Sequence, residues 1–245
     1  TAAERAIASL NLVSANDLVV QAQEAFTRRS RALTHSPSKP ELPPGDYVVR
    51  EAFHVTSGPF EGLAGEVGVT RVDAAAPSHY RRSATARLFV DDRLLEMTQL
   101  PGVSLPVELA LSWPRGIRAR FAYDGVERDE SLSRALLYAL RVAAIAIGER
   151  AMTNVSMRAE PELVRHAIVA WASSTRTLGD GEINTKTLGK LASVPAWPTA
   201  YGKLVSLADL ETYALRTSAI CVAPRGPEEP PDGRPVLDAK LTADV

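Results

Sequence analysis

Arginine residues gather in three short segments of this sequence, and two of these segments also carry aromatic side chains. A guanidinium group binds phosphate oxygens, and an aromatic ring can stack on a nucleic-acid base. The pattern predicts contact with nucleic acid, although arginines that alternate along a strand are also the ordinary solvent-facing residues of that strand. The predicted nucleic-acid-binding residues are Arg28, Arg29, Arg31, Arg81, Arg82, Arg115, Arg118 and Arg120.

Residues that could act in catalysis do not form a known motif. The sequence has 4 histidines, which lie far apart and form no H-x-x-x-H pair, and it lacks the G-x-S-x-G and G-x-x-x-x-G-K-[ST] patterns. Cys221 stands in an apolar stretch, which favours a buried, inert thiol. No catalytic residue is therefore predicted, and the sequence favours a non-catalytic protein. An enzyme of unrecognised family, with a site assembled from distant residues, stays open.

Two groups of carboxylates have simple structural interpretations. Asp91 and Asp92 separate two apolar runs and suit the turn of a hairpin. Glu127, Asp129 and Glu130 precede an apolar stretch and suit the positive end of a helix dipole. Neither group predicts an acid–base pair.

One loop resembles part of a calcium site. The run from Gly179 to Lys186 is similar to the second half of an EF-hand loop, between two predicted helices. The first, third and twelfth positions of that loop carry carboxylates in the family, but here they hold Arg176, Leu178 and Thr187. The sequence therefore predicts neither a metal site nor any other cofactor.

Composition limits the class of protein. The 245 residues are 45% hydrophobic and 23% charged, which is typical of a globular chain, and the formal net charge is −1. A single cysteine excludes an internal disulfide, and the first residues do not form a signal-peptide pattern. The longest nearly apolar run, 135–147, contains Arg141 and is shorter than the ~20 residues that span a membrane, so no membrane contact is expected.

The pattern of residues predicts an α+β fold. A helical arm is expected at residues 1–35, a Pro-rich linker at 36–46, a core at 47–223 and an extended tail at 224–245. The linker contains prolines that cannot continue the helix, and it is typical of a semi-rigid spacer. The tail is rich in proline and acidic residues and has no pattern of core residues, so we expect another surface to order it.

The core divides into a β-rich part and a helical part. Short alternating runs between residues 47 and 123 predict a small sandwich or barrel with two hairpins. The first hairpin turns at Asp91 and Asp92, and the second pairs 107–111 with 117–123. The helical part covers 131–217, beginning with a helix that Ser131 can cap. Its expected helices are 132–152, 161–176, 185–192 and 207–217, and an apolar stretch follows at 219–222.

A second resemblance lies in the β-rich part. The run from Val55 to Val67, with glycines at 58, 62 and 65, resembles a KOW motif. That motif occurs in small barrels of ribosomal and transcription-elongation proteins. The resemblance implies a monomeric, nucleic-acid-associated factor with a small barrel.

Together these features favour a structural, self-assembling subunit. An arm and a tail flank a core that has no active-site motif, and such segments can reach neighbouring copies and add avidity. We therefore expect a homo-oligomer formed through both ends of the chain, with the arginines facing nucleic acid. A viral or phage coat or nucleocapsid protein fits this description, which places it in a virion or the cytoplasm. The KOW-like factor and the unrecognised enzyme are the alternatives.

Overall fold

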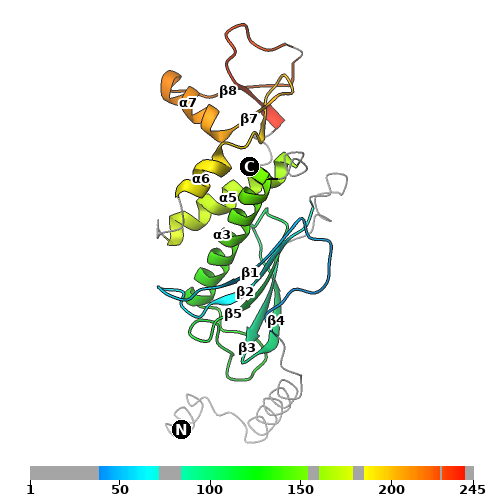
Figure 1. Ribbon diagram of the computed structural model, residues 1–245, viewed down its shortest axis with the longest axis vertical. Helices are drawn as coiled ribbons and strands as arrows, with labels where there is room; N and C mark the ends of the chain where they lie inside the picture. The colour runs from blue at the N-terminus through cyan, green and yellow to red at the C-terminus, as the bar shows by residue number, and fades with distance from the viewer. Residues whose placement is uncertain (1–38, 72–83, 154–159, 179–184, 227, 241–245) are drawn as a thin grey trace, which may run out of the picture.

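The computed structural model describes residues 39–71, 84–153, 160–178, 185–226 and 228–240. These residues form a five-stranded sheet, helices on one of its faces, and a small lobe at the opposite end of the molecule (Figure 1). The α+β class is confirmed, whereas the predicted arm at 1–35 lies outside the described residues. In chain order the elements are β1 (Val49–His54), β2 (Ala64–Val69), β3 (Thr85–Val90), β4 (Arg93–Gln99), β5 (Val107–Ser112), α3 (Glu130–Thr153), α5 (Pro161–Leu178), α6 (Thr185–Ala192), β6 (Trp197–Pro198), β7 (Leu204–Val205), α7 (Leu207–Thr217), β8 (Cys221–Ala223) and β9 (Val236–Asp238).

The five long strands form one open sheet in the order β1-β2-β5-β3-β4. All neighbours are antiparallel except β3 and β5, which run parallel. The expected sandwich or barrel is therefore wrong for the described residues, because β1 and β4 are the two edges of an open sheet. The same finding applies to the barrel that the KOW resemblance implied. Alternation indicated that these strands have a buried face, but a helix rather than a second sheet covers it.

One of the two expected hairpins is present. β3 and β4 pair across Asp91 and Asp92, whose φ values of 50° and 58° match a two-residue turn that tolerates aspartate. The expected pairing of 107–111 with 117–123 is wrong, because β5 pairs with β2 and β3 on its two sides. The segment after β5 makes only an isolated bridge between Ala119 and Val126.

α3 is the core helix of the protein. It contacts β1, β2 and β5 on one side and α5 and α6 on the other, which confirms that most of its circumference is covered. Most of its alanines, including Ala139 and Ala143, are fully buried and allow this close approach. The segment Glu130–Ala151 is long and apolar enough to cross a membrane, but its packing against both layers is that of a core helix. Asp129, rather than Ser131, caps it, since Asp129 Oδ1 accepts the N–H of Leu132 at 2.9 Å.

A buried arginine joins α3 to α5. Arg141 is 3% exposed, and its guanidinium lies 5.4 Å from the ring centroid of Trp171. Its Nε donates to Ser174 Oγ at 3.2 Å, and its Nη2 donates to Thr175 Oγ1 at 3.3 Å. The residue that interrupts the apolar run in the sequence is therefore part of the helix–helix contact.

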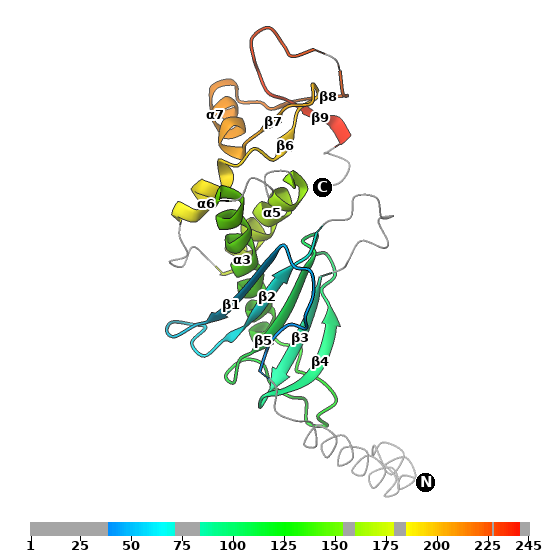
Figure 2. The same cartoon turned by 45° about the vertical axis from the view of Figure 1, so that its right-hand side comes forward.

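Residues 39–47 lie against the sheet face that α3 leaves open, and we call this segment the strap (Figure 2). Leu42, Phe89 and Ala110 form a small cluster there, and Tyr47 packs against it. The neighbours of Ala110 on β5 belong instead to the main core beneath α3, as alternation along a strand requires. The described part of the Pro-rich segment is therefore packed on the sheet, whereas the domain boundaries proposed from the sequence stay a prediction.

The elements from β6 to β9 form a C-terminal lobe, residues 194–240. α7 begins with a capping box in which Ser206 Oγ accepts the N–H of Asp209. β9 pairs in parallel with β8, and the N–H of Ala200 donates to Val236 O at 2.7 Å. The described residues of the tail are therefore ordered by the lobe of their own chain.

Candidate functional site

The structure describes three of the eight arginines predicted from the sequence. Arg115, Arg118 and Arg120 lie together on the loop that follows β5, at the end of the sheet where β3 turns into β4. This loop and the turn line an open pocket with a volume of about 510 Å³. We call it the hairpin pocket. The other predicted residues, Arg28, Arg29, Arg31, Arg81 and Arg82, lie outside the described residues.

Trp113 fixes the start of this loop. Its indole Nε1 donates to Glu61 O at 3.1 Å, and its ring centroid lies 5.7 Å from that of Phe60. The N–H groups of Gly116 and Ile117 both donate to Trp113 O, which closes a tight turn. A Cβ on Gly116 would lie 2.0 Å from the indole ring, so only glycine fits beneath it. Trp113, which lies close to these arginines in the sequence, therefore has a structural role.

Carboxylates lie beside each of the three arginines. Arg118 Nη2 donates to Asp129 Oδ2 at 2.8 Å, and Arg118 Nε lies 3.2 Å from Glu127 Oε2. A phosphate group would have to compete with these carboxylates for the same donors. The other pairs are Arg115 Nη1 with Glu61 Oε2 at 3.5 Å, Arg120 Nε with Asp124 Oδ1 at 3.6 Å, and Arg120 Nη2 with Glu96 Oε2 at 3.9 Å.

The ion pair of Arg118 and Asp129 shifts the titration of both groups. The pKa of Asp129 is lowered, first by the N–H of Leu132 at the start of α3 and then by the hydrogen bond from Arg118. The pKa of Arg118 is raised, mainly by its hydrogen bond to Asp129. One carboxylate therefore both caps the core helix and holds an arginine at the rim of the pocket.

Asp91 and Asp92 face the pocket without a counter-ion among the described residues. The charged residues that line the pocket are two aspartates and two arginines, and only the arginines form ion pairs within the described part of the chain, so Asp91 and Asp92 are the charges still available to a ligand. Phe121 adds an apolar group at the rim, where its side chain is 99% exposed. A hollow with an exposed aromatic side chain and two carboxylates that have no ion-pair partner in the described chain suits a cationic and partly apolar group better than it suits phosphate.

The hairpin pocket does not contain the groups of a familiar catalytic site. Neither His54 nor His166 lines it, and His35 and His79 lie outside the described residues. Within the described ranges, no three His, Cys, Asp or Glu side chains gather as they would around a metal ion. Cys221 lies in β8 and is only partly buried.

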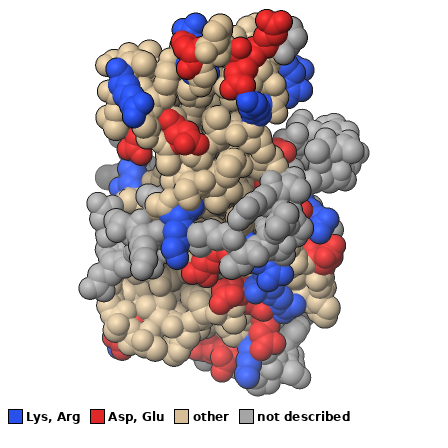
Figure 3. Space-filling view, turned by 45° about the horizontal axis from the view of Figure 1, so that its top comes forward, with Lys and Arg blue, Asp and Glu red and all other residues tan. Residues whose placement is uncertain are grey.

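The C-terminal lobe exposes several large apolar side chains. Half of the large exposed hydrophobic residues in the described chain belong to this lobe. Within the lobe, Leu215 is the most exposed of these residues, at 80%. A viewpoint with the lobe brought forward shows mainly uncharged surface, with basic and acidic residues scattered between (Figure 3). The four residues are Leu204, Leu215, Ile220 and Val222.

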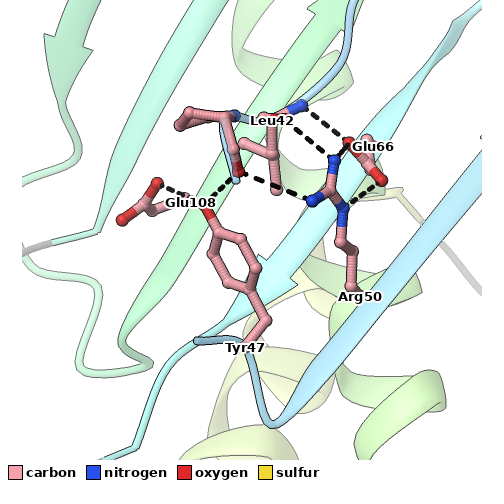
Figure 4. Close-up of polar contacts among 6 residues, drawn as sticks. Leu42, Tyr47, Arg50, Glu66 and Glu108 are labelled. Atoms are coloured by element: carbon pink, nitrogen blue, oxygen red, sulfur yellow. Dashed lines mark hydrogen bonds and ion pairs between the residues drawn. The ribbon is translucent and has the colours of Figure 1, made fainter. Parts of the chain in front are cut away.

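A cluster of hydrogen bonds holds the strap on the open face of the sheet (Figure 4). Glu66 accepts the N–H of Leu42 at 2.6 Å and Arg50 Nε at 2.6 Å. Arg50 Nη2 in turn donates to Leu42 O at 2.8 Å, so backbone, carboxylate and guanidinium close a ring. The hydrogen bond from Arg50 is the main reason why the pKa of Glu66 is lowered.

Tyr47 closes the other end of this cluster. Its hydroxyl donates to Glu108 Oε2 at 3.0 Å. Burial, and after it this hydrogen bond, raise the pKa of Tyr47 to about 12. The side chains of Arg50, Glu66 and Glu108 each form a hydrogen bond with the strap, and Tyr47 belongs to it. The cluster therefore has a structural role, which is to fasten the strap to the sheet.

No protein-family model matches this sequence, and no curated protein matches it either.

Proposed function

We propose that this protein is a non-catalytic subunit that assembles with copies of itself through its C-terminal lobe. The single observation that carries the proposal is the group of exposed apolar residues on that lobe, led by Leu215. Burying such side chains against a partner removes apolar area from water and drives association.

The small interior of the lobe supports this proposal. Among the described residues of 194–240, the large buried apolar side chains are Val194 and Leu210, and the other buried apolar residues are Ala196 and Ala200. A lobe with so little interior gains stability when its apolar surface is covered by a neighbour. The tail contributes indirectly, because β9 holds β8 in place and so presents Ile220 and Val222.

Sedimentation velocity over a wide range of protein concentrations tests the proposal. We expect the wild type to form oligomers and the variant Leu215→Asp to dissociate at concentrations where the wild type does not. The matched control is Val169→Asp on α5, since Val169 is also exposed, at 46%, but lies outside the lobe. A wild type that stays monomeric throughout, or a control that dissociates as readily as Leu215→Asp, would overturn the proposal.

A coat or nucleocapsid role is the narrower form of the same proposal. It requires phosphate contacts, for which the sequence offers the arginines of the arm and of the segment around residue 81. Fluorescence anisotropy with single-stranded RNA and DNA at two salt concentrations tests this role, because phosphate contacts weaken steeply as salt rises. Absent or salt-independent binding would remove nucleic acid from the proposal and leave self-assembly standing.

A further inference from the structure

The turn between β3 and β4, which lines the hairpin pocket, and the C-terminal lobe lie toward opposite ends of the long axis of the molecule (Figure 1). The topology explains this separation. β3 and β5 run parallel toward the hairpin pocket, and α3 begins beside the pocket and runs back along the sheet. α5 and α6 then lead to the C-terminal lobe. A contact between the pocket and the lobe therefore joins two different copies.

The chemistry of the two surfaces is complementary. The hairpin pocket offers the carboxylates of Asp91 and Asp92 beside the exposed ring of Phe121. The last turn of α7 carries the exposed side chain of Leu215 and, one residue further on, the guanidinium of Arg216, which has no ion-pair partner among the described residues. Asp91 and Asp92 in the pocket and Arg216 in the lobe are therefore opposite charges that have no ion-pair partner among the described residues of their own chain.

We propose that the lobe of one copy docks in the hairpin pocket of the next, with Arg216 facing Asp91 and Asp92 and Leu215 packing beside Phe121. This inference rests on the proposed self-assembly and specifies its geometry. The two partner surfaces differ, so the contact is heterologous and runs head to tail. Repetition of the contact gives a closed ring or a filament, according to the rotation between successive copies.

Two variants with one defective surface each test this geometry. The pocket variant is Asp91→Asn/Asp92→Asn/Phe121→Ser, in which asparagine still tolerates the positive φ of the turn. The lobe variant is Leu215→Ser/Arg216→Glu, which changes only exposed side chains. Both variants keep one intact surface, and neither changes a residue of the core.

We expect each variant alone to be monomeric at concentrations where the wild type assembles, with an apparent Kd raised at least about tenfold. Mixed together, they retain one intact pocket and one intact lobe, so they form a single contact. Sedimentation velocity of the mixture should show a one-to-one dimer with twice the 26.3 kDa mass of the chain, and no larger species.

The outcomes separate this inference from the proposed function. If the pocket variant assembles like the wild type and only the lobe variant is monomeric, the lobes pair with each other and the head-to-tail contact is wrong. If both variants assemble like the wild type, neither surface is the contact and the inference is again wrong. If the wild type itself never assembles, the proposed function fails together with the inference. Circular dichroism of each variant checks that the fold is intact.

Discussion

The substitution Leu42→Ala tests whether the strap is part of the folded core. The side chain of Leu42 is 4% exposed and packs against Phe89, Ala110 and Tyr47. Truncation removes three carbon atoms, worth ~2.4 kcal/mol of transfer free energy at ~0.8 kcal/mol each. The cavity that remains adds to this loss, so we expect the free energy of unfolding to fall by about 2–4 kcal/mol.

Denaturation in guanidinium, followed by tryptophan fluorescence, measures this change. The matched control is Val169→Ala, since Val169 is 46% exposed and lies outside the lobe, so its truncation should change the free energy of unfolding by less than about 1 kcal/mol. If Leu42→Ala changed stability as little as the control does, residues 39–47 would be a spacer that does not pack on the sheet. Such a result would refute the packing argument for the strap.

Three further predictions concern the strap and the start of α3. Gly68→Ala places a Cβ 2.6 Å from Leu42 Cδ1 and 2.7 Å from the ring of Tyr47. We expect this crowding to lower the free energy of unfolding, measured by denaturation, by about 1–3 kcal/mol. An unchanged value would show that the strap moves aside freely. The raised pKa of Tyr47 means that its folding contribution is complete below pH ~10 and is lost as pH rises toward 12, so wild-type stability should fall over that range more than that of Tyr47→Phe; identical profiles would contradict the burial of its hydroxyl. Asp129→Ala removes the cap of α3 and should cost about 0.5–2 kcal/mol at pH 7. Because the pKa of Asp129 is lowered in the folded protein, this deficit should shrink as pH falls below ~4, and a deficit independent of pH would argue against an ionised cap.

Local signals predicted the helices well. The expected ranges 185–192 and 207–217 coincide with α6 and α7, and Pro161 begins α5 as expected. Prolines, caps and apolar spacing act within a few residues, so these signals are fully present in the sequence. The turn at Asp91 and Asp92 was predictable for the same reason.

The arrangement of the strands was not predictable in this way. Nothing in the segment Val107–Ser112 indicates that it inserts between β2 and β3, since that choice depends on the fit of the whole sheet. The segments 107–111 and 117–123 both have a strand-like pattern and flank a turn, which suggested a hairpin. Such a pattern indicates which face of a strand is buried, but it does not identify the strand with which it pairs. The second segment instead became the loop of the hairpin pocket, where Ile117 alone is deeply buried.

The charge around the described arginines depends on residues that are distant in the sequence. Along the sequence, Arg115, Arg118 and Arg120 stand together and suggest a positive patch. In the folded chain, Glu61 and Glu96 approach them from other loops and strands, while Asp129 reaches Arg118 from the start of α3. The charge of a surface is set by all groups within a Debye length, and sequence spacing counts only some of them.

The tail changes the argument for assembly without removing it. Its composition suggested that another surface orders it, and Val236 and Asp238 lie in a strand that pairs with β8 of the same chain. Order in the described residues of the tail therefore requires no partner. The unsatisfied surface lies instead on the elements that the tail holds in place, where Leu215 and Val222 remain exposed because the lobe is too thin to bury both faces of α7 and β8. We therefore expect removal of the tail to weaken assembly only because β8 loses its partner strand. A chain without the tail whose lobe stays folded should still assemble.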